Sequence, residues 1–361
     1  KTAYEILSGL VGSEMCIRDS IIGSGGAGNN TLLRLYKEGM TSLELLAVNT
    51  DAQHLLNTTV PHRMLIGKIL TKGLGAGSEP NVGEGAAEEA RHEILEACRD
   101  ADIVFLTGGL GGGTGTGSLP VIAKLAKESG ALTIAIVTLP FSNEGARRTR
   151  NARRGLEKLR KCADTVIVIR NEKLLTEDIA QLPLNLAFRQ ADEILGNAIK
   201  CMTEITSHSG LVNIDFADMR SIMSSGGVAM IGLGEGQGAT RASDAVTAAL
   251  TSPLLELDIE DSKGALVNVT GGDDMTLQEA HEVVREVHSK INKDARIIWG
   301  ASVDSTLEHQ IRVMLVVTGV KSSQILGPSS GVDDEMQNRY GIELSLIHIS
   351  APTRPERIGY A

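Results

Sequence analysis

The sequence predicts an α/β fold: a doubly wound parallel sheet that a long central helix joins to a smaller α+β C-terminal domain. Apolar runs typical of buried strands alternate with helical periodicity as far as residue 171, which favours a parallel sheet with helices on both faces. Glycine-rich loops follow several of these runs, where ligands bind in such sheets. The length of 361 residues also suggests two domains.

The amino-acid composition and the net charge of the chain exclude several classes of function. Hydrophobic residues make up 42% of the chain and aromatic residues only 2%, so we expect an aliphatic core. The formal net charge of −10 disfavours a nucleic-acid partner, because such partners need a basic face. No apolar run is long enough to cross a membrane. The cysteines and histidines show no metal-ligand spacing, and the cysteine usage favours a reducing cytoplasm.

Both ends of the chain fit the pattern poorly. Residues 1–20 have no clear period, and residues 344–355 are equally irregular; both strings resemble translated sequencing-adapter DNA. We therefore expect a non-native extension over residues 1–20 and a non-native end, and exclude both from fold reasoning. Without residues 1–20, only Ile21 and Ile22 remain of the first strand that the fold requires. Residues 322–361 are expected to form a disordered tail.

The most informative stretch is a glycine cluster over residues 111–117. A buried strand, residues 102–107, leads into it, and a helical pattern, residues 120–127, follows. Without Cβ atoms, successive N–H groups can converge on a phosphate at a helix N-terminus. A tightly turning loop is the alternative, but this density of glycine at the end of a strand favours phosphate binding.

A second glycine loop opens the chain's first helix. Residues 23–30 match the dinucleotide fingerprint Gly-x-Gly-x-x-Gly, and Asp51 follows the next strand. An NAD-dependent oxidoreductase using Gly23, Gly25, Gly28 and Asp51 is therefore a rival hypothesis. NAD binding leaves the glycine cluster at residues 111–117 without a role.

The glycine cluster Gly-Gly-Gly-Thr-Gly-Thr-Gly resembles the signature of the tubulin/FtsZ family of GTPases. Residues 23–30, 49–53 and 71–77 are similar, in order, to other nucleotide loops of that family. The resemblance covers about residues 21–320 and implies a Rossmann-like GTP-binding domain over residues 21–183. It implies these nucleotide contacts: Gly25, Gly26, Ala27, Asn29, Asn49, Asp51, Gly75, Ala76, Gly77, Gly111, Gly112, Gly113, Thr114, Gly115, Thr116 and Gly117.

Three further residues match the family pattern beyond the glycine cluster. Glu144 and Arg148 are spaced as one turn of the helix expected from residue 141 onward. A carboxylate suits ribose hydroxyls, and an arginine suits sugar or phosphate oxygens. Asn171 follows the strand at residues 165–171 and matches the family asparagine near the guanine edge. Without the resemblance, a surface ion pair is the better interpretation of Glu144.

Residues 184–208 predict one long helix, and we assign residues 184–210 to the central helix of the family. Phe188 and Asp192 share a face of it. The resemblance implies that Phe188 stacks on the purine and that Asp192 accepts hydrogen bonds from guanine. The usual residue at this position in the bacterial members of the family is Asn; the change to Asp keeps an acceptor. A core Phe with a solvated Asp is the alternative.

Asp215 and Asp218 lie at the start of the next helix, where they could act as an N-cap and as compensation for the helix dipole. Together with Asn213 they also match the family's catalytic loop, which reaches the nucleotide of the neighbouring subunit. The resemblance therefore implies Asp215, Asp218 and Asn213 as catalytic residues. Residues 211–321 are expected to form the C-terminal polymerisation and GTPase-activating domain.

Taken together, the resemblance implies a cytoplasmic GTPase that binds GTP, GDP and Mg²⁺ and polymerises head to tail into cell-division filaments. Its implied partners are further copies of itself, membrane-tethering proteins and other division proteins, at the division site. No metal-ligating side chain, nucleic-acid partner or direct membrane insertion is expected. Besides the oxidoreductase, a nucleotide-binding filament protein that does not hydrolyse its nucleotide is an alternative.

Overall fold

The computed structural model describes residues 18–40, 43–174, 193–205 without 194 and 204, 211–224 without 213, 227–255, 262–292 and 294–319. The expected tail, residues 322–361, and most of the expected N-terminal extension lie outside the described residues. Of the expected central helix, the structure describes residues 195–203 as helical. The rest of that prediction lies largely outside the described part.

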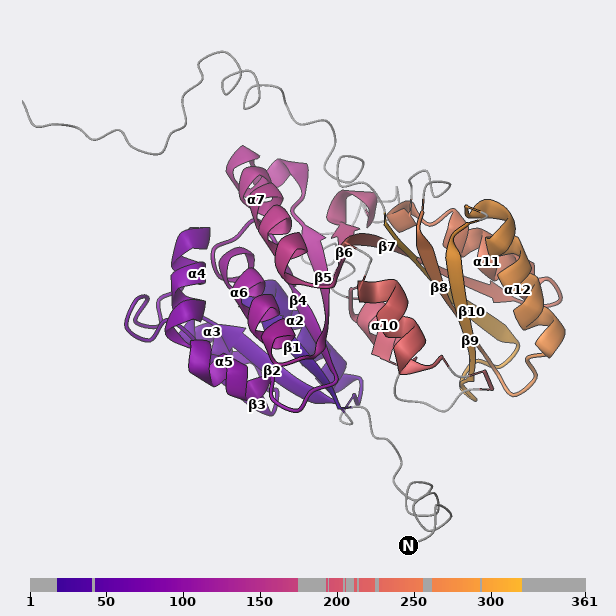
Figure 1. Ribbon diagram of the computed structural model, residues 1–361, viewed down its shortest axis with the longest axis horizontal. Helices are drawn as coiled ribbons and strands as arrows, with labels where there is room; N and C mark the ends of the chain where they lie inside the picture. The colour runs from indigo at the N-terminus through magenta and orange to yellow at the C-terminus, as the bar shows by residue number, and fades with distance from the viewer. Residues whose placement is uncertain are drawn as a thin grey trace, which may run out of the picture. The chain divides into compact units, whose positions relative to one another are not determined.

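Ten described strands form one continuous sheet in the order β3-β2-β1-β4-β5-β6-β7-β10-β8-β9 (Figure 1). The first six in this order run parallel. These strands are β1 (Asp19–Ser24), β2 (Glu44–Asn49), β3 (His62–Leu65), β4 (Ile103–Gly109), β5 (Leu132–Leu139) and β6 (Thr165–Arg170). Residues on both faces of β1, β4, β5 and β6 are buried, as expected for a parallel sheet, whereas β3, at the edge, is exposed or half-buried.

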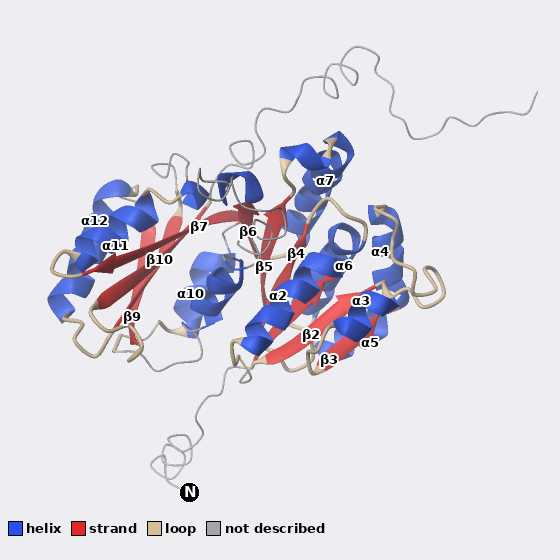
Figure 2. Ribbon diagram, turned by 180° about the vertical axis from the view of Figure 1, so that it is seen from behind, coloured by secondary structure: helices blue, strands red, loops and turns tan. Residues whose placement is uncertain are grey.

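Helices cover both faces of this parallel part, so the predicted doubly wound fold is confirmed (Figures 1 and 2). Alternate strand residues such as Ile21 and Phe105 pack with α2 (Gly25–Lys37) and with the helical residues 195–203. On the other face α6 (Thr114–Glu128) packs between neighbouring helices. Those neighbours are α4 (Pro80–Glu89), α5 (Arg91–Ala97) and α7 (Ala146–Cys162); α3 (Ala52–Asn57) follows β2.

The C-terminal part has the predicted α+β character. Its strands are β7 (Gly227–Gln237), β8 (Gly264–Gly271), β9 (Arg296–Val303) and β10 (Gln310–Thr318). β10 runs antiparallel to β7 and β8, and β9 runs parallel to β8. The helices α11 (Arg241–Leu250) and α12 (Leu277–Lys290) pack on this sheet, and α10 (Phe216–Ser224) also contacts β8 and β9.

Strand β7 joins the two parts at the level of the backbone. Its first residues, from Gly227 to Ala229, pair in parallel with β6, and from Ala229 to Gln237 it pairs with β10. The two expected domains therefore share one sheet. Among the described helices, none has the combination of length and hydropathy that crossing a membrane requires.

Three boundaries differ from the sequence predictions. β1 begins at Asp19 because the backbone of residues 19–20 pairs with β4, so the strand extends two residues before Ile21. The apolar spacing of residues 84–98 predicts one amphipathic helix. The structure begins this helix at Pro80 and breaks it at Ala90, whose ψ of 15° leaves the helical range. The helix expected from residue 141 is interrupted at Gly145, whose φ of 99° separates the turn η1 (Ser142–Glu144) from α7.

Candidate functional site: a cavity at the carboxyl ends of the strands

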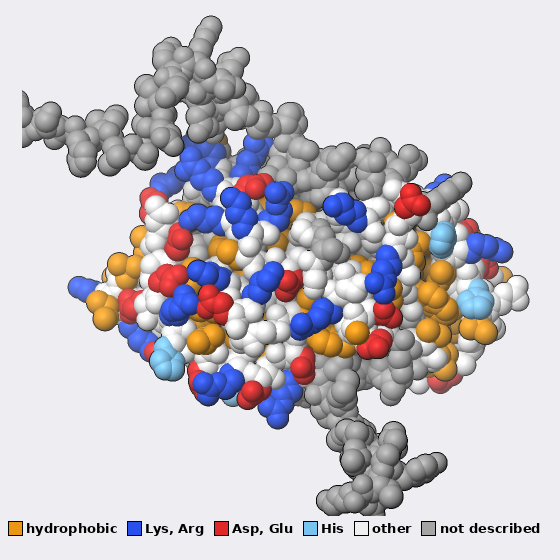
Figure 3. Space-filling view, viewed as in Figure 1, with side chains coloured by type: hydrophobic (Ala, Val, Ile, Leu, Met, Phe, Trp, Pro, Cys, Tyr) orange, Lys and Arg blue, Asp and Glu red, His pale blue; other side chains and the backbone are white. Residues whose placement is uncertain are grey.

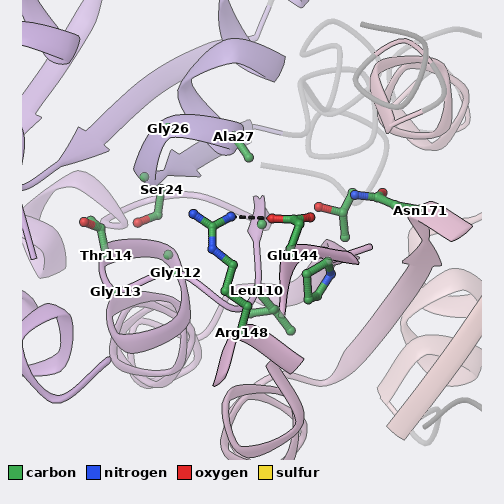
Figure 4. Close-up of a pocket in the computed structure, with 15 residues that line it drawn as sticks. Ser24, Gly26, Ala27, Leu110, Gly112, Gly113, Thr114, Glu144, Arg148 and Asn171 are labelled. Atoms are coloured by element: carbon green, nitrogen blue, oxygen red, sulfur yellow. Dashed lines mark hydrogen bonds and ion pairs between the residues drawn. The ribbon is translucent and has the colours of Figure 1, made fainter. Parts of the chain in front are cut away.

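The carboxyl ends of β1, β4, β5 and β6 meet at one edge of the sheet, and a cavity of about 310 Å³ lies there (Figure 4). Parallel strands bring the loops that follow them to a common edge, so segments far apart in sequence become neighbours. The cavity is lined by Ser24, Gly25, Gly26, Ala27, Gly109, Leu110, Gly112, Gly113, Thr114, Gly115, Thr138, Pro140, Glu144, Arg148 and Asn171.

Two helix N-termini open into this cavity. Gly25, Gly26 and Ala27 are the first residues of α2, and Thr114 and Gly115 are the first residues of α6. Neither helix has an acidic residue in its first turn. The unpaired N–H groups and the helix dipoles therefore present positive partial charge to the cavity. This arrangement suits an anion such as a phosphate chain.

Two predicted contact residues support the loops instead of lining the cavity. Asn29 is fully buried, and its side-chain amide lies within hydrogen-bond distance of the carbonyls of Gly23, Gly25 and Val48 and of Asn49 Nδ2. Asn49 Oδ1 in turn accepts from the N–H groups of Thr50 and Asp51, at 2.9 and 3.2 Å. These two asparagines tie the loop after β1 to the loop after β2.

The third loop, residues 71–77, is held by the second. Ala52 N donates to Gly73 O at 3.0 Å, and Gly75 N donates to Thr50 O at 3.1 Å. Asp51 caps α3 by accepting from His54 N at 3.0 Å. Asp51, Gly75, Ala76 and Gly77 do not line the cavity, so the prediction that they contact the nucleotide finds no support in this geometry.

The signature glycines have different roles, which a Cβ placed on each one shows. A Cβ atom placed on Gly112 has no neighbouring atom within 4 Å, so a side chain there would point into open space at the cavity. At Gly113 it would lie 2.8 Å from Ala76 Cβ and 2.9 Å from Glu79 N. At Gly117 it would lie 2.0 Å from Pro80 O. Glycine at these last two positions therefore allows α6 to pack closely against α4 and the third loop.

The hydroxyl groups of the signature are largely used within the loop. Thr116, which is buried, accepts from Gly111 N at 2.8 Å. Thr114 Oγ1 lies 2.6 Å from Thr50 Oγ1, and Thr114 also lines the cavity. Gly111, Thr116 and Gly117 are absent from the cavity lining, so these three residues shape the loop.

Glu144 and Arg148 lie together at the cavity, as their spacing predicts. Glu144 Oε1 accepts from Phe141 N at 2.9 Å, and Glu144 Oε2 is bonded to Arg148 Nη1. Figure 4 shows the Arg148 side chain reaching from α7 into the cavity toward Glu144. Glu144 belongs to η1 rather than to α7, so the pair spans the break at Gly145.

Asn171 provides a polar atom for a ligand. It is 8% exposed, it lines the cavity, and its Oδ1 has no hydrogen-bond partner within the described part of the chain. A buried acceptor of this kind costs free energy unless a donor reaches it. The cavity is the direction from which a ligand donor would come.

Of the other predicted site residues, Phe188, Asp192 and Asn213 lie outside the described residues. Asp215 and Asp218 do not line the cavity. Asp215 Oδ1 accepts from Ala217 N at 3.1 Å, and Asp218 Oδ1 accepts from Arg296 Nη2 at 2.7 Å. Both lie at the beginning of α10, and Asp218 is bound to β9 of the C-terminal part.

Sequence reasoning did not select five of the lining residues. Ser24 is the last residue of β1 and Gly109 the last of β4, and Thr138 and Pro140 flank Leu139, the last residue of β5. Leu110 stands between the strand and the glycine cluster. The rule that ligands bind at the carboxyl ends of parallel strands could have identified four of them; it gives no reason to single out Leu110.

No cluster of three or more His, Cys, Asp or Glu side chains suited to a metal ion is found among the described residues. The described lining residues offer the hydroxyls of Ser24, Thr114 and Thr138 and the single carboxylate of Glu144. Such a lining fits a cation only if the ligand brings most of its oxygen atoms, as nucleotide phosphates do for Mg²⁺.

Two protein-family models match the chain, one over the nucleotide-binding part and one over the C-terminal part. Residues 20–177 match the model of the "Tubulin/FtsZ family, GTPase domain", and residues 227–321 match the "FtsZ family, C-terminal domain". The chain is 55% identical over 323 residues to cell division protein FtsZ 1 of Archaeoglobus fulgidus, covering 90% of this chain and 87% of that protein. It is 53% identical over 303 residues to FtsZ 1 of Methanocaldococcus jannaschii, covering 84% and 83%.

Solved structures of FtsZ proteins have the same fold as this chain. An empty FtsZ dimer from M. jannaschii superimposes with a TM-score of 0.82 and 51% identity, covering 88% of this chain and 92% of that chain. The matches span the sheet, both of its parts and the loops that build the cavity. The chain therefore belongs to the tubulin/FtsZ family of GTPases, and within it to the FtsZ proteins.

Proposed function

We propose that this protein binds GTP in the cavity, hydrolyses it to GDP and phosphate, and assembles head to tail into filaments that act in cell division. The observation that carries the proposal is the convergence of the N-termini of α2 and α6 on one cavity. The family membership supports it, and it gives the NAD-dependent oxidoreductase and the non-hydrolysing filament protein no support.

In this proposal the nucleotide lies across the edge of the sheet. The backbone of residues 25–27 and 112–115 receives the phosphates, and Arg148 neutralises part of their charge. Glu144 lies where ribose hydroxyls can donate to it. Asn171 Oδ1 accepts from the base; the 2-amino group of guanine is such a donor, and adenine lacks it. Phe188 and Asp192 remain proposed base contacts.

Hydrolysis needs a group that orients a water molecule in line with the terminal phosphate. The only carboxylate among the described lining residues is Glu144, and it is bound by Phe141 N and Arg148. We therefore assign the orienting role to Asp215 and Asp218, with Asn213, of a second copy. The water oxygen bonds to phosphorus, the bond to the β-phosphate oxygen breaks, and the proton leaves with inorganic phosphate.

Mg²⁺ would be held mainly by phosphate oxygens and water, with Ser24 or Thr114 as the nearest hydroxyl groups, and would neutralise charge on the phosphates. Residues 21–183 carry nucleotide binding in this proposal, and residues 211–321 carry the carboxylates and the polymer contact. The central segment, residues 184–210, connects them. A head-to-tail contact is heterologous and therefore propagates into a filament.

We extend the proposal to the partners of the family: membrane-tethering and division proteins, met in the cytoplasm at the division site. A solved FtsZ dimer supports self-association among the relatives.

The test is the dependence of GTP turnover on protein concentration, measured as phosphate release while light scattering reports assembly. If the carboxylates come from a second copy, turnover per subunit rises steeply with concentration. Constant turnover per subunit, down to concentrations at which no oligomer is detected, would place the whole active site in one chain and overturn the assignment of Asp215 and Asp218. Parallel titrations with GDP, ATP and NAD check the choice of ligand.

A further inference from the structure

Helix α7 is strongly basic in an acidic protein. Its 17 residues include six arginines, two lysines and one glutamate, whereas the whole chain has a formal net charge of −10. Figure 3 shows a group of Lys and Arg side chains over this helix. A basic helix on an acidic protein creates a local positive potential that attracts anions.

Part of this charge is already compensated. Arg147 is paired with Glu79 and Lys158 with Glu84, both from α4 or the residue before it. Arg148 is paired with Glu144. Two arginines are different: Arg150 and Arg154 are exposed, and within the described part of the chain neither forms an ion pair or a side-chain hydrogen bond. At i and i+4 they share one face of α7.

The two arginines lie within two helical turns of Arg148 along α7. Arg148 lines the cavity, and Asn151 Nδ2 lies 3.5 Å from the carbonyl of Gly111 and 3.2 Å from that of Ser78. With a rise of 1.5 Å per residue, Arg150 and Arg154 are about 3 and 9 Å from Arg148 along the helix. Lys161, also exposed, is about 20 Å away by the same measure.

The carboxylates around the entrance do not cancel these two charges completely. Glu79 and Glu144 are each held by an arginine. Glu172 is exposed and accepts from Ser142 N at 2.9 Å, so it offsets part of the positive potential. A positive charge acts over about 10 Å at 0.1 M salt. The separations of Arg150 and Arg154 from the cavity-lining Arg148 along the helix axis fall within this range, and that of Lys161 does not.

We propose that Arg150 and Arg154 form a steering surface that speeds the entry of a nucleoside triphosphate into the cavity without contacting the bound nucleotide. The inference rests on the proposed GTP-binding function. A chain with net charge −10 repels a polyanion at long range, and a local basic surface beside the entrance offsets this repulsion. Steering raises the association rate constant and leaves the dissociation rate constant unchanged.

The experiment measures association of a fluorescent GTP analogue with nucleotide-free, full-length protein, by stopped flow, at protein concentrations below assembly. The variant is Arg150→Gln combined with Arg154→Gln. At about 0.1 M salt we expect its association rate constant to be about three- to fivefold lower than that of the unmodified protein. At about 0.5 M salt the difference should fall below about 1.5-fold. The dissociation rate constant should be equal in both proteins.

Lys161→Gln is the control for position, because it removes one positive charge from an exposed residue of the same helix that lies farther from Arg148 along the helix axis. We expect its association rate constant to stay within about 1.5-fold of the unmodified protein. A fluorescent guanosine without phosphates should associate equally fast with all three proteins, if it binds at all.

Three results would overturn the inference: an unchanged association rate constant in the double variant, a change that salt does not remove, or an effect of Lys161→Gln as large as that of the double variant. Loss of filament bundling with unchanged association would instead identify the surface as a docking site for an acidic macromolecule, and would also overturn it. If the unmodified protein does not bind the GTP analogue, the proposed function fails first.

Discussion

The nucleotide half and the C-terminal half of this molecule use polar groups in opposite ways. Around the cavity, Asn29, Asn49 and Thr116 are buried and hydrogen-bonded within and between the loops, and the backbone N–H groups of two helix N-termini face the cavity. In the C-terminal half the candidate catalytic side chain Asp218 is about half exposed and tied to Arg296. Binding is thus prearranged within one half, whereas the groups proposed for hydrolysis face outward.

Buried charge in the C-terminal half has a structural role. Arg241 is 6% exposed; its Nε lies 2.6 Å from Glu279 Oε1, and its Nη1 lies 2.6 Å from Asp274 Oδ2. His309 Nδ1 contacts the same Asp274 oxygen at 2.9 Å. This cluster joins α11, the loop before α12 and the turn before β10. Asp274 is nearly as exposed as Asp218, so the two sites differ in the cation: the guanidinium of Arg241 is buried, whereas that of Arg296 is exposed.

The largest effect is expected from Asp218→Asn, which keeps the shape of the side chain but removes its charge. GTP turnover should fall by about 100-fold or more, because a positioned acid–base group contributes that much, while GTP affinity stays the same. The measurement is phosphate release at saturating GTP together with equilibrium binding of a fluorescent GTP analogue.

Asp244→Asn is the matched control, because Asp244 also lies in the first turn of a C-terminal helix, α11. Its turnover should equal that of the unmodified protein. Wild-type turnover in Asp218→Asn, or an equal loss in both variants, would contradict a catalytic role that is specific to Asp218.

The second-largest effect is expected from valine substitutions in the glycine cluster, where Gly112→Val and Gly113→Val should differ in their effect on stability. Valine at residue 112 enters open space at the cavity and should weaken GTP binding about tenfold or more while the free energy of unfolding stays nearly unchanged. Valine at residue 113 meets Ala76 and Glu79 N and should also lower the free energy of unfolding by about 1–3 kcal/mol.

Urea unfolding without nucleotide and GTP titration of both variants separate the two effects. Equal stability of the two variants would show that Gly113 has no packing role. Normal GTP affinity of Gly112→Val would place the phosphates away from this loop.

The smallest effect is expected at the buried charges of the C-terminal half. The hydrogen bond from Arg241, followed by those from Thr276, holds the pKa of Glu279 at about 2, below its ordinary 4.5. Because the folded-state pKa is depressed, the stabilisation is present above about pH 4.5 and is lost as the pH falls toward 2. Glu279→Gln should therefore lower the free energy of unfolding by about 1–2 kcal/mol at pH 6, since solvent screens part of the interaction.

Unfolding followed by circular dichroism at several pH values checks this, with the unmodified protein beside the variant. The difference between the two should shrink as the pH drops from 4.5 toward 2. A difference that does not depend on pH would mean that Glu279 contributes through packing and not through its charge.

Local pattern predicted most of the secondary structure. The apolar run at residues 132–139 predicts a strand, and β5 spans those residues. The patterns of residues 227–321 predict four strands and two helices, and all six appear. The predicted ends of helices and strands were wrong where contacts with another segment of the chain determine them. β1 extends to Asp19 because β4 offers backbone groups to pair with, and the break at Ala90 has no signal in residues 84–98.

For the site, the sequence by itself predicted that the glycine loops after β1 and β4 bind a ligand, because dense glycine at the end of a strand has few other physical explanations; residues of both loops line the cavity. It also determined the association of Glu144 with Arg148, since one helical turn of spacing survives the break at Gly145. Such inferences need only neighbours along the chain.

Only the tertiary structure decided which residue of each loop faces the cavity. Gly112 faces open space and Gly117 packs against Pro80 because of how α6 lies on α4, and residues 80 and 117 are brought together only by folding. The same holds for Asn29 and Asn49, whose amides meet across two strands, and for Asp215 and Asp218, which share a chain with the cavity but do not reach it. A residue's direction depends on the packing of distant segments, and local pattern carries no record of that packing.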